Sequence, residues 1–411
     1  MHTPLPRRQV AAVVAGNALE FYDFVTYAFF AAQIGRTFFP AATPAGSLLA
    51  SLATFGVGFL TRPLGALVIG RMGDRVGRKP AMLLSFTLIG IAMAGIALTP
   101  SYAAIGPLAP VLVVGFRLLQ GFALGGEVGP SASYLMEASP PLRRGFYISL
   151  WSMSADLAVM VAGLVGVGLS SVMSATTLDD WGWRVAFLIG VAILPLGLIL
   201  RRSLVETLHK PEIAVAPSTG IARIVVLGIA LLAAATTTNY VLEYMTTYAG
   251  QTLGMRATLA FGATAVLGLC SAAADVAGGT LSDRFGRKRA MIVPWCFLLA
   301  AVLPAFWAIA HFRNGAALFA ATATLAVASC LSSSVVLVAI TESLPRAARS
   351  GSLALIYAVA ISIFGGSTQF IVTWLIAATG NPLAPAWYMG GAVLVGLVAM
   401  IAMPETAPAK A

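Results

Sequence analysis

The chain has 411 residues, of which 59% are hydrophobic and only 10% charged, and its mean hydropathy is +0.90. This composition leaves too little polar surface to cover a soluble globule of the same size, so it excludes that class and indicates an integral membrane protein. The formal net charge of +10 does not indicate a nucleic-acid partner, because most basic residues gather at one end of the expected membrane spans. Three widely spaced cysteines match no metal or redox motif.

Apolar windows of about 20 residues recur along the whole chain and predict twelve transmembrane helices. The windows cover residues 9–36, 47–69, 81–99, 107–136, 145–171, 183–200, 223–249, 256–280, 290–310, 316–341, 352–378 and 386–403. The basic N-terminal stretch runs into the first window without a small-residue cleavage site, so we expect a first span there and not a removed signal peptide. The excess of lysine and arginine at one side predicts that both termini are cytoplasmic and that the protein lies in the inner cell membrane.

The second half of the chain repeats landmarks of the first half. The loop GRMGDRVGRK (70–79) returns as GTLSDRFGRK (279–288), and EASPPLRRG (137–145) returns in looser form as ESLPRAARSG (342–351). Both landmarks follow matching spans, which indicates a duplicated six-span unit. We therefore expect an all-α membrane protein with two pseudo-symmetric six-helix bundles, at 1–202 and 223–411, joined by a cytoplasmic linker at 203–222.

These motifs resemble those of a known family. The G-x-x-x-D-R-x-G-R-K loops resemble the signature of the Major Facilitator Superfamily, and GNALEFYDF, GFLTRPLGALVIGRMGDRVGRK and RLLQGFALGGEVG resemble its metabolite:proton symporter family. The pieces at 236–249 and 363–388 resemble the citrate and tricarballylate permeases of that family. The resemblance implies two bundles around a central cavity, alternating access, and uptake of an organic acid together with protons.

The same resemblance implies a cytoplasmic charge lock in the loops. Each loop aspartate would cap a neighbouring helix and pair with arginine while the cavity faces outward, with Glu137–Arg143 and Glu342–Arg349 as further pairs. The alternative is that these charges reflect membrane topology alone. The expected gating residues are Asp74, Arg75, Arg78, Glu137, Arg143, Asp283, Arg284, Arg287, Glu342 and Arg349.

Asp23 and Arg117 are the expected proton-coupling pair. No histidine lies within an expected span, so we expect carboxylates to bind the coupled proton. An Asp–Arg pair across spans one and four also resembles the proton switch of sugar symporters. Arg117 would hold Asp23 ionised, and Asp23 would take a proton when Arg117 is drawn away. Glu20, one turn from Asp23, and Glu127, on the Arg117 face, would be relay sites. Alternatively, the pair only joins two helices.

Substrate is expected to meet arginines, tyrosines and amides that face the cavity. Guanidinium groups stay charged inside proteins and bind carboxylates in pairs of hydrogen bonds. However, Asp156, Glu243 and Asp275 stand where the citrate-permease resemblance leads us to expect uncharged residues, which leaves room for a zwitterion or a substrate with a cationic group. The expected substrate-binding residues are Arg62, Arg117, Tyr27, Gln120, Asp156, Asn239, Glu243, Tyr244, Tyr357 and Gln369.

The sequence therefore predicts a secondary transporter that couples proton entry to uptake of a small carboxylate such as citrate. The rival in the same class is a proton symporter of a betaine- or proline-like zwitterion. An enzyme is disfavoured because no nucleophile, base or metal-ligand cluster has a recognisable spacing, and a channel is disfavoured by the paired loop locks. We expect no cofactor and no metal, and as partners only substrate, protons and the lipid bilayer, with the protein a monomer.

Overall fold

The computed structural model describes residues 7–125, 139–202, 221–344 and 349–406. Every regular element in these ranges is helical. In chain order they are α1 (Arg7–Phe29), α2 (Ala31–Phe38), α3 (Pro44–Leu60), α4 (Arg62–Arg75), α5 (Arg78–Leu98), α6 (Tyr102–Ile105), α7 (Leu108–Gly125), η1 (Pro141–Arg143), α9 (Arg144–Val172), α10 (Ala175–Thr177), η2 (Leu178–Gly182), α11 (Trp183–Arg202), α12 (Ile221–Glu243), α13 (Met245–Thr247), η3 (Tyr248–Thr252), α14 (Ala257–Phe285), α15 (Arg287–Phe312), α16 (Gly315–Ser343), α17 (Arg349–Val359), η4 (Ala360–Gly365), α18 (Gly366–Thr379) and α19 (Ala384–Ala402).

These elements form the predicted spans. Ten stretches within the described ranges are long and apolar enough to cross a membrane, and α1 and α11, of 23 and 20 residues, supply the other two long helices. The predicted all-helical fold with twelve spans is therefore confirmed. The fourth span was predicted to reach residue 136, but residues 126–138 lie outside the described ranges. Residues 203–220 also lie outside them, so the exact division into bundles and linker stays a prediction.

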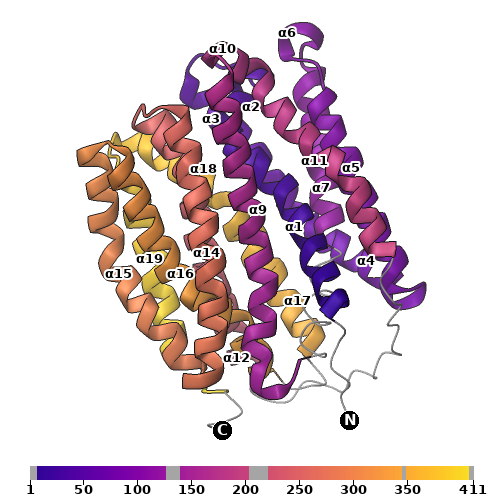
Figure 1. The fold of residues 1–411 in the computed structure, drawn as a ribbon, viewed down its shortest axis with the longest axis vertical. Helices are drawn as coiled ribbons and strands as arrows, with labels where there is room; N and C mark the ends of the chain where they lie inside the picture. Colours follow the sequence, from indigo (N-terminus) through magenta and orange to yellow (C-terminus); the bar gives the residue numbers. More distant parts are fainter. Residues whose placement is uncertain (1–6, 126–138, 203–220, 345–348, 407–411) are drawn as a thin grey trace.

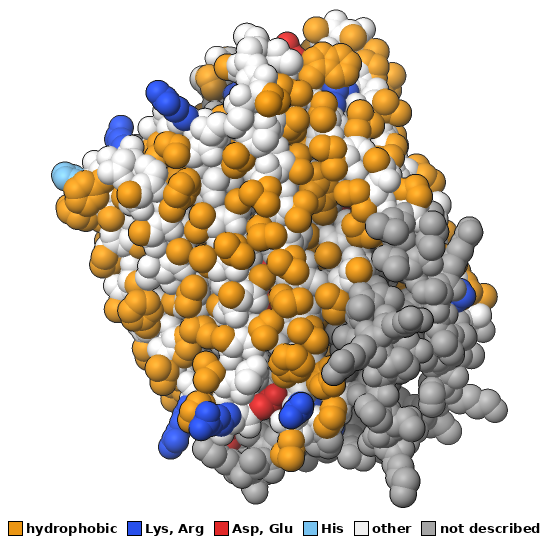
Figure 2. Space-filling model, in the orientation of Figure 1, with side chains coloured by type: hydrophobic (Ala, Val, Ile, Leu, Met, Phe, Trp, Pro, Cys, Tyr) orange, Lys and Arg blue, Asp and Glu red, His pale blue; other side chains and the backbone are white. Residues whose placement is uncertain are grey.

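The helices α9 and α14 lie side by side at the centre of the molecule and join its two parts (Figure 1). Following the predicted division, we call helices α1 to α11 the first bundle and α12 to α19 the second, and the described part of the chain begins and ends at the same end of the molecule. Hydrophobic side chains are spread over the described part of the face seen in Figure 2, whereas the visible charged side chains lie mostly toward its two ends. This is the surface that a lipid bilayer requires of a multi-pass protein.

The repeated loops share one backbone feature, a positive φ angle that glycine adopts easily and other residues rarely do. Gly77 has φ 130° and Gly286 has φ 98°, and each stands at the matching position of its D-R-x-G-R-K motif. Side chains with a Cβ rarely adopt such values. The glycine lets the chain leave one span and begin the next, α5 or α15, at the following residue.

Small residues let the helices of the first bundle approach closely. A Cβ placed on Gly121 of α7 would overlap the backbone oxygen of Gly58 on α3. Nearby, the Thr61 hydroxyl donates to the Leu118 backbone oxygen at 2.7 Å. In a membrane, such small-residue contacts and interhelical hydrogen bonds are what hold helices together. They fix α7, and with it Arg117 and Gln120, against α3.

We predict that Gly121→Ala lowers the midpoint of thermal unfolding of the purified protein, because the added methyl group has no space and overpacking costs about 1–3 kcal/mol. Gly115→Ala is the matched control on the same helix, since nothing lies within 4 Å of a Cβ added there. Equal midpoints for the two variants would contradict the proposed helix contact.

Candidate functional site

Asp23 is buried at the centre of the first bundle and is reached by an amide. Its side chain, on α1, is 1% exposed. The Gln120 side-chain amide on α7 donates to Asp23 Oδ2, and Gln120 Oε1 accepts from Arg117 Nη1. Among the described residues, Asp23 and Arg117 do not form a direct ion pair. The expectation of a direct pair is therefore corrected: Gln120, one turn from Arg117 on the same helix face, stands between the two charges.

Arg117 itself is fully buried among aromatic rings. Its Nη2 donates to the Phe55 backbone oxygen at 3.2 Å, and its guanidinium carbon lies 4.5 Å from the ring centre of Tyr27, 4.9 Å from that of Phe55 and 5.0 Å from that of Phe24. The negative faces of these rings stabilise a cation away from water. Asp23 Oδ1 and Arg117 Nε have no hydrogen-bond partner, so both groups keep capacity to bind something else.

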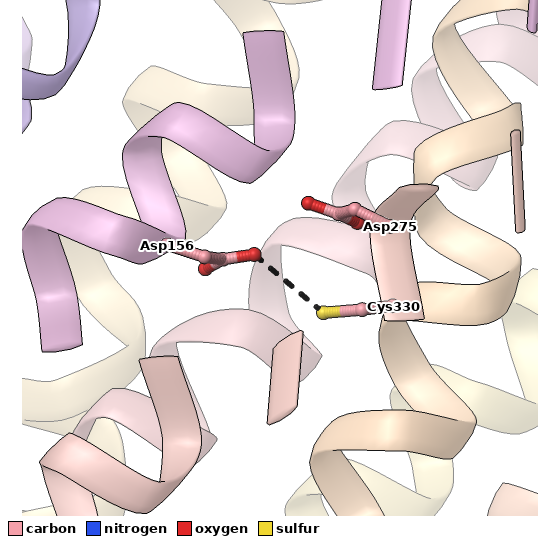
Figure 3. A group of neighbouring side chains, drawn as sticks. All are labelled: Asp156, Asp275 and Cys330. Atoms are coloured by element: carbon pink, nitrogen blue, oxygen red, sulfur yellow. Dashed lines mark hydrogen bonds between the residues drawn. The ribbon is translucent and has the colours of Figure 1, made fainter. Parts of the chain in front are cut away.

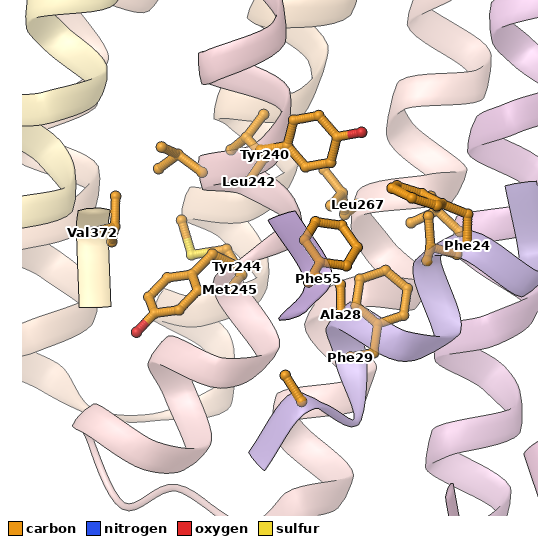
Figure 4. Packing of buried hydrophobic residues seen from close by; sticks show 14 of the residues in the cluster. Phe24, Ala28, Phe29, Phe55, Tyr240, Leu242, Tyr244, Met245, Leu267 and Val372 are labelled. Carbon is orange, nitrogen blue, oxygen red and sulfur yellow. The ribbon is translucent and has the colours of Figure 1, made fainter. Parts of the chain in front are cut away.

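Arg62 brings a second guanidinium to the seam between the bundles. It lies 4.1 Å from the ring centre of Phe59, and its Nε is buried without a hydrogen-bond partner. Arg62 is close enough to Tyr240 and Tyr357 to act on both electrostatically. Figure 4 shows Phe55 and Tyr240, from α3 and α12, near one another, with ring centres 6.1 Å apart. Residues of both bundles therefore surround Arg62.

The second bundle presents polar groups on the same seam. Asn239 Nδ2 donates to Glu243 Oε1 at 2.9 Å, while Glu243 Oε2 has no partner although the residue is only 6% exposed. Gln369 Nε2 lies 3.5 Å from the Tyr240 backbone oxygen, and its Oε1 is also unpartnered. The Tyr244 hydroxyl accepts from Thr373 Oγ1 on α18 at 3.0 Å. This wall of the second bundle therefore presents two acceptor oxygens without partners, Glu243 Oε2 and Gln369 Oε1, opposite the Arg62 Nε donor, which also has none.

Asp156, Asp275 and Cys330 come together where α9, α14 and α16 meet (Figure 3). One carboxylate oxygen of each aspartate and the thiol sulfur lie within 4.8 Å of one another. The thiol is directed at Asp156 Oδ2 over 4.0 Å, a weak hydrogen bond. The sequence showed no metal-ligand spacing, and no spacing could have shown this group, because its members come from three distant spans.

A charge network at the end of the molecule that carries the termini joins the bundles. Arg287 donates to Asp283 Oδ1 at 2.7 Å and to Glu342 Oε2 at 3.1 Å. Asp283 also accepts from the backbone N–H groups of Gly145 and Phe146, both at 3.0 Å. Since these N–H groups belong to the start of α9, a carboxylate at the end of α14 caps a helix of the other bundle.

Glu405 is a member of this network that sequence reasoning missed. Its carboxylate accepts from the backbone N–H groups of Arg287 at 2.8 Å and Lys288 at 3.1 Å, and so caps α15. The next residue, Thr406, donates to Glu342 at 3.1 Å. The only signal in the sequence was an acid just after the last span, which is a weak one.

Several predicted site residues cannot be placed. Glu127 and Glu137 lie outside the described ranges, as do the side chains of Glu20, Asp74, Arg75, Arg78 and Arg349. Glu342, expected to pair with Arg349, contacts Arg287 and lies 3.9 Å from Arg144. Arg143 is exposed, Arg284 stacks on Phe285, and Tyr27 donates to the Ser51 backbone oxygen at 3.4 Å. His311 lies in the last turn of α15 and is exposed, so a histidine does reach the end of one span.

Comparisons with known proteins give one family. The family model described as Major Facilitator Superfamily matches residues 14–359. Citrate-proton symporters of Klebsiella pneumoniae and Salmonella typhi are 36% and 37% identical, covering 95% and 97% of this chain and 90% and 95% of those proteins. The proline/betaine transporter of Escherichia coli K12 is 32% identical over 98% of this chain and 84% of its own. The crystal structure of a D-xylose-proton symporter has a TM-score of 0.78 at 19% identity, with 98% of both chains covered, which is a likeness of fold.

We predict that Asp283→Ala lowers the free energy of unfolding by about 2–3 kcal/mol, because it removes the cap of α9 and leaves Arg287 with fewer partners. The midpoint of thermal unfolding measures this. Asp179→Ala is the control, since its pair with Arg36 has side chains 39% and 41% exposed and surface pairs contribute about 1 kcal/mol or less. A loss no larger than that of the control would contradict the interbundle cap.

Proposed function

This chain belongs to the Major Facilitator Superfamily, and we propose that it is a proton-coupled symporter that imports a small organic acid, a di- or tricarboxylate such as citrate, by alternating access. Because the members of this family are multi-pass membrane transporters, the proposal starts from transport as the function of this chain. The names of the citrate-proton symporters, which match along nearly the whole chain, support both the proton and the carboxylate. We further propose that it works in the inner membrane with both termini in the cytoplasm.

The observation that carries the proposal is the buried chain from Asp23 through Gln120 to Arg117. A carboxylate in this position stays ionised only while the amide and the nearby guanidinium stabilise it. If either group turns toward a bound substrate, the carboxylate loses that stabilisation and takes a proton from the open side. The neutral acid then crosses with the moving helices at low electrostatic cost. Substrate binding and proton uptake are thereby linked.

Arg62 supports a carboxylate as the substrate group. Its Nε is a buried donor without a partner, and a buried unsatisfied donor costs free energy that a ligand acceptor would recover. Arg117, also with an unpartnered Nε, is in the first bundle as well, whereas Gln369 and Tyr357 face the seam from the second. A molecule with two or more carboxylates can contact both arginines at once, which favours a di- or tricarboxylate over a monocarboxylate.

One observation favours a zwitterion as the second candidate. Glu243 Oε2 is an unpartnered acceptor on the wall opposite Arg62, and a molecule with a carboxylate at one end and a quaternary ammonium at the other could bridge the two. The proline/betaine transporters among the relatives point the same way. Counterflow in proteoliposomes separates the candidates: exchange of citrate without exchange of glycine betaine supports the first, and the reverse result overturns it.

We predict that Asp23→Asn abolishes accumulation of citrate driven by an inward proton gradient but preserves citrate counterflow. An amide cannot take up or release the coupled proton, whereas exchange of substrate for substrate needs no net proton movement. Uptake by the wild type should rise as the external pH is lowered, and uptake by this variant should not respond. Asp179→Asn, at the exposed pair, is the control. Accumulation that survives Asp23→Asn would show that the proton travels elsewhere.

We predict that Arg62→Ala raises the Kd for citrate about tenfold or more, because a hydrogen bond to a charged group contributes about 1.5–3 kcal/mol. Titration calorimetry of the purified protein measures it, with Arg36→Ala as the matched arginine control. Glu243→Gln tests the substrate's charge: tighter citrate binding is expected, since the carboxylate repels an anion. An unchanged Kd in Arg62→Ala would remove Arg62 from the site.

A further inference from the structure

Asp156 and Asp275 face each other across the boundary of the two bundles, in a place that the proposed coupling chain does not use. Asp156 is on α9 of the first bundle, and Asp275 is on α14 of the second and 1% exposed. Their oxygens and the Cys330 sulfur of α16 lie within 4.8 Å of one another. These three side chains are therefore direct neighbours at the boundary.

No cation in the described part of the chain lies beside the pair to balance its charge. Among the described residues, neither aspartate forms an ion pair with lysine, arginine or histidine, and the titratable groups that face the pair from neighbouring helices are Cys330 on α16 and Glu243 on α12. Both of these groups are neutral or negative. Two ionised carboxylates in such a place would repel each other without compensation.

The helices α9 and α14 pack closely on either side of the pair. On one side of the pair a Cβ on Gly268 would lie 2.5 Å from the Asp156 backbone oxygen, and on the other side a Cβ on Gly279 would lie 2.5 Å from the Gly145 backbone oxygen. The backbones of α9 and α14 thus touch on both sides of the pair. This close approach of the backbones favours a proton or a small inorganic ion over a quaternary ammonium group between the two aspartates.

Two unpartnered polar atoms beside the pair point to the proton. Ser271, one helical turn before Asp275, is 1% exposed, lies beside the Cys330 thiol, and has no hydrogen-bond partner at Oγ. Asp275 Oδ2 has none either. A hydroxyl both donates and accepts, so next to a free carboxylate oxygen it provides the kind of path along which a proton is passed.

We propose that Asp156 and Asp275 hold one proton between them and form a second proton site that fastens α9 to α14. Release of this proton breaks the O–H bond of one carboxyl group, and the proton passes to water that enters as the bundles part. Two adjacent carboxylates then remain, and their repulsion keeps the helices apart until a proton returns. The role in coupling rests on the proposed symport function, but the presence of the proton does not.

The presence of the proton can be tested without transport. In the purified full-length protein in lipid nanodiscs at neutral pH, infrared spectroscopy should show the C=O stretching band of a buried protonated carboxyl group. The double variant Asp156→Asn/Asp275→Asn should lose this band. Asp23→Asn and Cys330→Ala should keep it, because the first removes an acid of the separate chain and the second removes only a weak hydrogen-bond donor.

A second measurement tests the coupling role. In proteoliposomes, the double variant should carry one proton fewer per substrate molecule than the wild type, while its midpoint of thermal unfolding shows that it remains folded. If the double variant keeps the infrared band, or if the wild-type band disappears when Na⁺ replaces K⁺ in the buffer, the pair does not hold the proton and the proposal is wrong. An unchanged proton ratio would overturn the coupling role. A wild type that shows the band but carries no carboxylate would refute only the symport function.

Discussion

The cost of placing charge in a dry interior governs this structure. A buried ionised group needs a partner of opposite charge or several hydrogen bonds, and otherwise it becomes neutral. The interior meets this constraint differently at three places: Asp23 reaches Arg117 through an amide, Arg287 bridges two acids at the end that carries the termini, and Asp156 and Asp275 meet with no cation among the described residues. In the proposed transport cycle, movement of the helices would change the partners or the protons of each arrangement.

Two of these places lie on one structural element, the contact between α9 and α14. Asp283 at the end of α14 caps the start of α9, and the acid pair lies further along the same two helices. Glycines make this contact possible, since a Cβ on Gly145 would lie 2.5 Å from the Gly279 backbone oxygen. Two helices that meet through glycines can move apart and come together again without repacking large side chains. In the proposed transport cycle, the cap and the acid pair control when the contact opens.

The fold could be predicted from the sequence because a membrane span needs a fixed length of apolar residues. The twelve windows and the repeated loops carried that information, and the glycines of the loops, Gly77 and Gly286, adopt positive φ as their motif requires. Side-chain partners could not be predicted so well. Helix periodicity placed Arg117 and Gln120 on one face but gave no means of telling that Gln120 stands between Arg117 and Asp23. The meeting of Asp156 with Asp275, and the cap that Glu405 places on α15, depend on how distant helices are arranged, which no local pattern records.

The central claim is that a carboxylate and protons enter together, and the most direct test follows the proton itself. Proteoliposomes containing the purified protein and a trapped pH-sensitive dye receive citrate outside, with no initial pH gradient. A proton-coupled citrate symporter should acidify the interior on addition of citrate, but not on addition of glycine betaine, and vesicles without the protein should show no change. Citrate entry measured by radiolabel without any acidification would contradict the account.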